Sequence, residues 1–89
     1  MNAAEIRLIG AFNPPSFKSW ICTRARLLDL KGSVTSDGTQ SISILVEGPQ
    51  ALIDAMEMAC SLGPMDALVD RVEVMPQALN GQLKTFTQL

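Results

Sequence analysis

Residues 46–74 read VEGPQALIDAMEMACSLGPMDALVDRVEV and carry the signals of three consecutive elements. A strand runs into Gly48-Pro49, and an apolar helix follows and continues to Leu62. Gly63-Pro64 ends that helix, because glycine suits the position just after a helix and proline cannot continue one. The last letters, VDRVEV, alternate apolar and charged residues as a half-buried strand does. The segment therefore predicts a strand–helix–strand unit.

The inner face of this helix is predicted from the spacing of its apolar residues. Residues three and four positions apart share one face of a helix, so the stripe facing the core is expected to comprise Leu52, Ala55, Met56, Ala59 and Leu62. Met58 falls off that stripe and is expected to lie partly exposed.

The first half of the chain repeats the pattern. Residues 5–10 alternate around Ile6 and Leu8 and predict an internal first strand, because apolar residues occur on both of its faces. Apolar residues then recur at helical spacing from Phe17 to Leu28, with Ser16 as the expected N-cap. This part therefore predicts a strand followed by an amphipathic helix.

Two further strands complete the predicted order. A hairpin joins residues 33–35 to residues 41–47 through a turn at Ser36–Thr39, and residues 82–89 form a final edge strand. The resulting order, strand–helix–strand–strand–helix–strand–strand, predicts an α+β, ferredoxin-like split βαβ sandwich. In it, two helices cover one face of an antiparallel sheet of four to five strands.

Composition limits the classes of function. The 89 residues predict a single domain, 1–89, and the net charge of −2 gives no electrostatic basis for binding nucleic acid or an anionic membrane. No apolar run approaches the roughly 20 residues of a membrane span, and no signal peptide is evident, so a cytoplasmic location is expected. Cys22 and Cys60 are expected to be buried free thiols. Without histidine or a Cys-x-x-Cys pair, a metal site is not expected.

The run V-E-G-P…G-P…V-D-R-V-E-V resembles the second half of an acylphosphatase. That family hydrolyses the carboxyl–phosphate bond of acyl phosphates, with no cofactor, metal or covalent intermediate. Its first motif, roughly G-x-V-Q-G-V-x-F-R, holds the phosphate with backbone N–H groups and with the final arginine. Its second motif, roughly G-W-V-x-N followed by D-G, supplies an asparagine that orients the attacking water.

The resemblance covers nearly the whole chain and implies a set of site residues. Lys18 falls at the position of the family arginine and Ser36 at that of the asparagine, so these two are the implied catalytic positions, both substituted. The implied phosphate-binding loop contains Asn13, Ser16 and Phe17. The remaining matches are Gly10, Gly32, Val34 and Asp37-Gly38, whereas Ser33 replaces the tryptophan.

The departures at the site lead to an expectation of lost catalysis. Pro14 and Pro15 have no N–H, and they hold the preceding Asn13 in an extended conformation. Lys18 keeps a positive charge but lacks the planar fork of arginine, and Ser36 is shorter than asparagine. Loss of one transition-state donor typically lowers the rate by about 10²–10³-fold. We therefore expect a protein that has lost acyl-phosphate hydrolysis and acts as a binding or structural module.

Two alternatives remain open. The first is a weak acylphosphatase that hydrolyses small acyl phosphates, with Lys18 binding the phosphate and either Ser36 or a nearby amide holding the attacking water. The second is a small-molecule-sensing regulatory domain, because the same fold plan serves that role. The expected partners are a small anion or acyl phosphate, or a protein or second copy that pairs with the edge strand around Phe86.

Overall fold

A computed structural model describes residues 1–38, 40–64 and 67–89 of the chain. Thr39, the last residue of the predicted hairpin turn, lies outside the described residues. The elements in chain order are β1 (Asn2–Ala11), α1 (Pro14–Leu27), β2 (Lys31–Ser36), β3 (Ser41–Gly48), α2 (Gln50–Leu62), β4 (Leu68–Gln77) and β5 (Phe86–Gln88).

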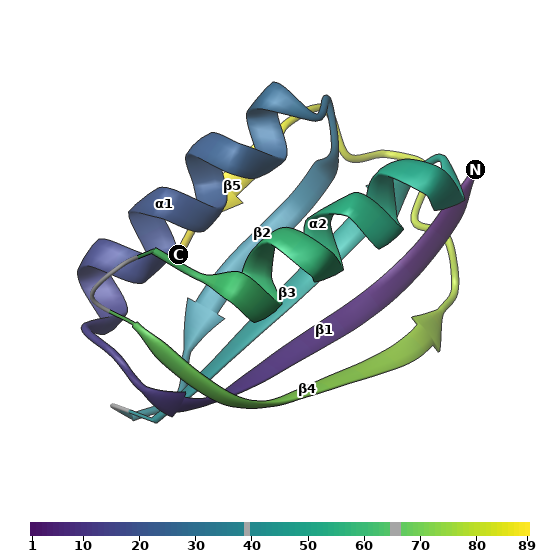
Figure 1. Ribbon diagram of the computed structural model, residues 1–89. Coiled ribbons are helices and arrows are strands. Elements are labelled where there is room, and N and C mark those ends of the chain that lie inside the picture. Colours follow the sequence, from purple (N-terminus) through teal and green to yellow (C-terminus); the bar gives the residue numbers. More distant parts are fainter. Residues whose placement is uncertain (39, 65–66) are drawn as a thin grey trace.

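The strands form one five-stranded sheet in the order β4-β1-β3-β2-β5, and both helices lie on one of its faces (Figure 1). The predicted α+β, ferredoxin-like fold is confirmed. The antiparallel prediction holds for β4, β1, β3 and β2, whereas β5 runs parallel to β2. The segment after β4 crosses the sheet at the end where β4 finishes. Because β2 starts at that same end, β5 must run in the direction of β2.

The core lies between the sheet and the two helices. Along β3, Ile42, Ile44 and Val46 are buried against the helices, as their alternation with polar residues predicted. The side chains that meet them from the helices and from neighbouring strands include Ile6, Leu8, Phe17, Ile21, Ile53 and Met56. The opposite face of the sheet carries no helix and is called here the helix-free face (Figure 1).

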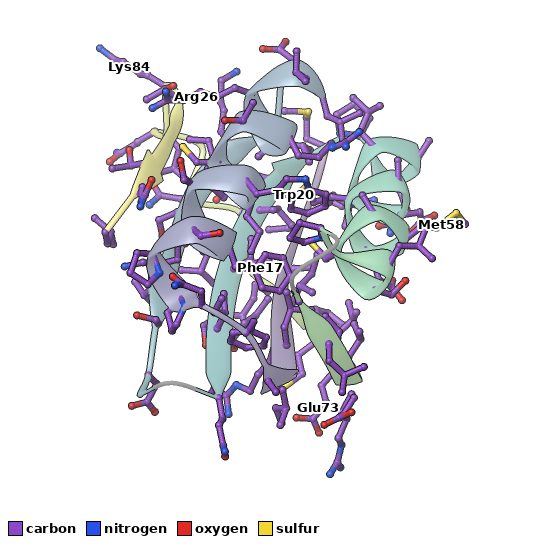
Figure 2. The ribbon with its side chains drawn as sticks, turned by 60° about the vertical axis from the view of Figure 1, so that its left-hand side comes forward. Phe17, Trp20, Arg26, Met58, Glu73 and Lys84 are labelled. Atoms are coloured by element: carbon purple, nitrogen blue, oxygen red, sulfur yellow. The ribbon has the colours of Figure 1, made fainter. Side chains whose placement is uncertain are left out.

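The inner face of α2 differs from the predicted stripe. Its buried residues are Ile53, Met56 and Cys60, whereas Leu62 is 78% exposed. Leu62 sits in the last turn, just before the Gly63 cap, where the helix has passed the edge of the core. Met56 is buried as predicted, and Met58 is exposed and points away from the sheet (Figure 2).

The short strand β5 is an edge, as predicted, but its phenylalanine belongs to the core. Phe86 is fully buried, and its carbonyl accepts bonds from Nε and Nη2 of Arg26 on α1 at 3.1 and 2.9 Å. The N–H of Leu89 donates to the carbonyl of Val34 at 2.9 Å. The ring of Phe86 is therefore not available to a partner at this edge.

Both cysteines are free and buried, as predicted. Burial raises the pKa of the Cys60 thiol to about 12, and the charge of Arg24 opposes this only in part. Neither α1 nor α2 combines the length and the apolar character that crossing a bilayer requires.

Candidate active site

The ends of several elements meet at one end of the sheet (Figure 1). The pairing of β1 with β3 sets Ile9 opposite Ser41, and the pairing of β2 with β3 sets Ser36 opposite Ile42. The end of β1, the start of α1 and the end of β2 therefore lie at the same end. These segments carry all of the residues that the sequence implied for the site: Asn13, Ser16, Phe17, Lys18 and Ser36.

Gly10, at the end of β1, has no room for a side chain. A Cβ at this position would lie 2.0 Å from the carbonyl oxygen of Leu68 on β4. The pairing of β1 with β4 also shifts register between Ile9 and Gly10, where Asp70 of β4 has no partner on β1, so the pairing is irregular just before the loop begins. The N–H of Gly10 donates to the carbonyl of Gln40 at 3.1 Å and so ties the loop to the β2–β3 connection.

Asn13, not Ser16, caps helix α1. Asn13 is extended, with φ −90° and ψ 106°, as expected for a residue before proline. Its side-chain oxygen Oδ1 accepts a bond from the N–H of Ser16 at 3.2 Å, and its carbonyl accepts one from Phe17 at 2.9 Å. The prediction of Ser16 as the cap was wrong because Pro14 and Pro15 fit the first two helical positions, which move the cap to the residue before them.

The loop offers two backbone donors to an anion. Pro14 and Pro15 have no N–H, and the N–H groups of Ser16 and Phe17 are bonded to Asn13. The first turn of α1 therefore presents no unbonded N–H groups of its own. By contrast, the N–H groups of Phe12 and Asn13 have no hydrogen-bond partner within the part of the chain that the structure describes.

Lys18 extends toward the C-terminal end of β5. Its Nζ donates to the main-chain oxygen of Leu89 at 2.6 Å. An ammonium group has three N–H donors, so two remain for another acceptor. The bond to Leu89 fixes the position of the cation at the same end of the sheet as Ser36, because β5 runs parallel to β2.

Phe17 is a core residue that supports the loop. Its ring is 1% exposed and packs edge-to-face against Phe12, with ring centroids 5.1 Å apart, and against Trp20 at 5.7 Å. Phe17 and Trp20 both point into the layer between the helices and the sheet (Figure 2). Edge-to-face pairs add about 0.5–1.5 kcal/mol beyond their burial, so this cluster holds the backbone of the loop at Phe12.

Ser36 is the last residue of β2 and is exposed. The hairpin that follows is closed by a bond from the N–H of Asp37 to the carbonyl of Ser41 at 2.9 Å. Gly38 has φ +75°, the conformation that the predicted turn needed from glycine. The hydroxyl of Ser36 therefore stands at the start of a defined turn, at the site end of the sheet.

Two features of the site were missed by sequence reasoning. Lys18 and Leu89 are 71 positions apart, and no local pattern links them. The unbonded N–H groups of Phe12 and Asn13 depend on where the cap falls. That position was available in the sequence, because an asparagine directly before two prolines is a cap signal in its own right.

The fold matches solved acylphosphatases. An acylphosphatase structure from Bacillus subtilis aligns with a TM-score of 0.92 over 100% of this chain and 99% of that one, at 20% identity. One from Coxiella burnetii also aligns with a TM-score of 0.92, over 99% of this chain and 92% of that one, at 17% identity. Likeness at this level of identity establishes the shared fold.

The sequence relatives overturn the expectation of lost activity. A protein of Rhodospirillum rubrum named acylphosphatase is 32% identical over 92% of this chain and 90% of its own length. One of Acidiphilium cryptum is 33% identical over 98% and 99%. The expectation of a binding or structural module rested on the substitutions at Lys18 and Ser36 and on the N–H groups that Pro14 and Pro15 lack. Lys18 keeps two donors, and the N–H groups of Phe12 and Asn13 have no hydrogen-bond partner among the described residues, which the expectation did not foresee. The weak-acylphosphatase alternative fits the relatives better.

The family assignment extends over almost the entire sequence. The family model described as Acylphosphatase matches residues 5–88, which include the loop after β1, both helices and all of the sheet except the first three residues of β1. This chain belongs to the acylphosphatase family.

Proposed function

We propose that this protein is an acylphosphatase that hydrolyses the carboxyl–phosphate bond of small acyl phosphates. The observation that carries the proposal is the arrangement at one end of the sheet. There, Lys18 has two spare donors, and the N–H groups of Phe12 and Asn13 have no partner in the described ranges 1–38, 40–64 and 67–89. Family membership supplies the reaction, and these groups supply the positive charge and the donors that a phosphate requires.

Each residue has a proposed role in binding the phosphate. The ammonium of Lys18 neutralises part of the phosphate charge, and the two loop N–H groups bond to phosphate oxygens. Asn13 keeps these N–H groups in place because its side chain caps α1. Phe17 packs against Phe12 from the core side and so keeps the loop in position. The backbone N–H of Ser16 is already bonded to Asn13, so Ser16 acts through the cap.

The proposed chemical step is a direct displacement by water. The water oxygen forms a bond to phosphorus while the bond from phosphorus to the acyl oxygen breaks, and the carboxylate leaves with that electron pair. The water loses one proton to solvent, and the products are inorganic phosphate and a carboxylate. Ser36 is proposed to hold the attacking water through its hydroxyl. Positioning and charge stabilisation supply the rate, and the step uses no cofactor or covalent intermediate.

The expected rate is low for the family. The ammonium group of lysine binds phosphate as a single point charge, whereas the planar guanidinium of arginine can bond two phosphate oxygens at once. The hydroxyl of serine also lies closer to the backbone than the side-chain amide of asparagine. Restoring one good transition-state donor is worth about 10²–10³-fold in rate at most. Lys18→Arg and Ser36→Asn should therefore each raise kcat/KM, and the double variant should raise it further.

Hydrolysis of acetyl phosphate and benzoyl phosphate by the purified protein tests the proposal. We expect hydrolysis above the buffer rate, its loss in Lys18→Ala, and its retention in the matched control Lys84→Ala. Lys84 is exposed and lies far from the candidate site. The next residue, Thr85, accepts a bond from the N–H of Gly32, which is at the start of β2, whereas Ser36 is at its end. Hydrolysis that never exceeds buffer, or that is equal in Lys18→Ala and wild type, rejects the proposal.

The proposed location of the reaction is the cytoplasm. Cys22 and Cys60 are free and buried, and reduced thiols are typical of proteins in reducing compartments. Fractionation of cells that express a tagged protein tests this location, and recovery in an oxidising compartment would contradict it.

A further inference from the structure

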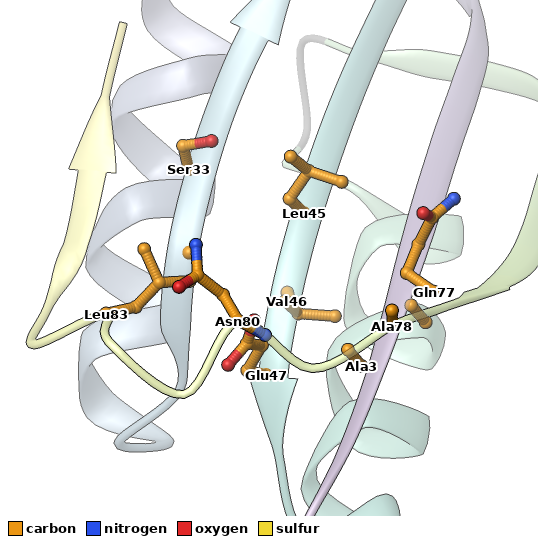
Figure 3. A pocket seen from close by; sticks show the side chains of 11 residues that line it. Ala3, Ser33, Leu45, Val46, Glu47, Gln77, Ala78, Asn80 and Leu83 are labelled. Atoms are coloured by element: carbon orange, nitrogen blue, oxygen red, sulfur yellow. Dashed lines mark hydrogen bonds between the residues drawn. The ribbon is translucent and has the colours of Figure 1, made fainter.

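The helix-free face carries a pocket far from the candidate active site. Residues 78–85 connect β4 to β5 by crossing this face, and a pocket of about 210 Å³ lies between that segment and the sheet (Figure 3). Its lining includes Ala3 near the start of β1 and Glu47 near the end of β3. These positions are at the opposite end of the sheet from Ser36 and Lys18, so the pocket is separate from the phosphate loop.

A buried carboxylate forms one wall of this pocket. Glu47 is 9% exposed, and its carboxylate accepts bonds from the N–H of Asn80 at 2.7 Å and of Gly81 at 3.3 Å. A carboxylate has about four acceptor positions, so two stay open. Burying a charge is costly unless it is paired, and within the described part of the chain no cation lies within 4.0 Å of Glu47.

The nearest cationic candidate in the sheet is Lys31. It lies directly opposite Glu47 in the pairing of β2 with β3, on the same face of the sheet. Side chains opposite each other in an antiparallel pair stand about 5 Å apart at Cβ, yet these two form no ion pair. Lys31 is also not part of the pocket lining. Glu47 therefore has no ion-pair partner among the described residues, and the groups that offset its charge are the two backbone N–H donors and the nearby Lys31.

The rest of the lining is apolar with a few polar groups. Leu45, Leu83, Ala3 and Ala78 provide the apolar walls, and Ser33, Gln77 and Asn80 provide hydroxyl and amide groups around them (Figure 3). Pockets of this kind, apolar with a few convergent polar groups, are the usual form of small-molecule sites. The volume has room for several water molecules or for a ligand with a short alkyl chain.

We propose that this pocket binds a small organic cation, a protonated primary amine with a short apolar chain. The ammonium bonds the open acceptor positions of Glu47, and the chain packs between Leu45 and Leu83. The site is independent of the proposed hydrolysis, because it uses none of the residues at the phosphate loop.

Titration of the isotope-labelled protein with n-butylammonium, followed by NMR, tests the proposal. Butan-1-ol and butyrate serve as neutral and anionic probes of the same size at constant ionic strength. We expect saturable shifts at the amides of Asn80, Gly81 and Glu47 with the ammonium, and weaker or absent shifts with the other two. Equal binding of butan-1-ol, or no saturable binding of the ammonium, overturns the proposal.

Three variants assign the binding to the pocket. Glu47→Gln should weaken ammonium binding by roughly tenfold, because it replaces a charge-assisted bond with a neutral one. Lys31→Ala should tighten binding by about two- to fivefold, because it removes a competing cation from a partly exposed position. Glu73→Gln, on β4 outside the pocket, is the matched control and should leave binding unchanged.

A further variant covers the case in which Glu47→Gln fails to fold. Leu83→Trp adds bulk to one wall of the pocket and leaves Glu47 unchanged. It should abolish the amide shifts that n-butylammonium causes, while circular dichroism shows that the protein remains folded. Ammonium binding that survives Leu83→Trp, or that weakens in Lys31→Ala, contradicts the proposed site. Hydrolysis of acetyl phosphate, measured alongside, should be unaffected by n-butylammonium, so the two proposals fail separately.

Discussion

Replacing Asn13 by aspartate separates the capping of α1 from the binding of phosphate. Asparagine and aspartate cap helices about equally well, and aspartate also gains about 0.3–1 kcal/mol from the positive end of the helix dipole. The cap bond to Ser16 needs only an oxygen, which aspartate supplies. Asn13→Asp should therefore be as stable as wild type or slightly more stable at neutral pH.

The same substitution should impair hydrolysis. Asn13 contributes one of the two unbonded loop N–H groups, so a bound phosphate would lie close to its side chain. Two unit charges about 6 Å apart, at an effective dielectric constant of about 40 for a half-exposed site, repel by about 1.4 kcal/mol. That energy corresponds to a loss of about tenfold in kcat/KM for each negative charge on the phosphate, and the loss should shrink at high salt.

The assay combines urea unfolding and acetyl phosphate hydrolysis on the same preparations. Asn13→Ala is the control for the cap, because it leaves the N–H of Ser16 unbonded and should cost about 1 kcal/mol of unfolding free energy. If Asn13→Asp hydrolyses acetyl phosphate as well as wild type does, phosphate does not bind at this loop. If Asn13→Asp is as destabilised as Asn13→Ala, the side chain is not the cap.

Three further predictions concern the fold. Phe86→Ala should lower the free energy of unfolding by about 3–5 kcal/mol in urea titrations, because it empties a fully buried ring site on the shortest strand; a loss below 1 kcal/mol would show that β5 contributes little to the core. Cys60 should resist iodoacetamide at pH 8 in the folded protein and react after unfolding, as mass spectrometry would show. The pKa of its thiol is about 12 in the folded protein against an ordinary 9.0. The protonated thiol should therefore contribute its full stabilisation below pH 9, and this contribution should decline as the pH rises from 9 to 12. Gly10→Ala should be strongly destabilised in thermal unfolding, since its Cβ would lie 2.0 Å from a backbone oxygen of β4, whereas Gly38→Ala, in open space at φ +75°, should cost only about 1 kcal/mol.

Local patterns predicted the framework of the fold well. The alternation along β3 and the glycine–proline stop after α2 both depend on residues close in sequence, and both appear in the structure as expected. The stripe of α2 was misjudged at Ala55 and Leu62, which are exposed, and it left out Ile53 and Cys60, which are buried. Apolar residues occur on most sides of this helix, so their spacing alone does not identify the side that meets the sheet. The direction of β5 was also beyond local patterns, since it depends on the path by which residues 78–85 cross the sheet.

The candidate site could be predicted only as a set of positions. Family motifs indicated Lys18 and Ser36, but the bond from Lys18 to Leu89 joins residues 71 positions apart and leaves no trace in local sequence. The pocket at Glu47 was not predicted for a similar reason. Its walls come from four strands and from a connection that brings Asn80 and Gly81 onto Glu47, which lies 33 and 34 positions earlier in the chain. Contacts of that range are set by topology rather than by spacing.

The bulge between β1 and β4 has a consequence for how this protein behaves at high concentration. β4 is a ten-residue edge strand, and its unpaired backbone groups could pair with a strand of another chain. Such edge strands are common starting points for aggregation. The irregular pairing opposite Ile9 and Gly10, with Asp70, Arg71 and Glu73 nearby, breaks the regular spacing that an incoming strand would need. Neutral replacements at these three charges should therefore promote precipitation long before they disturb the folded state.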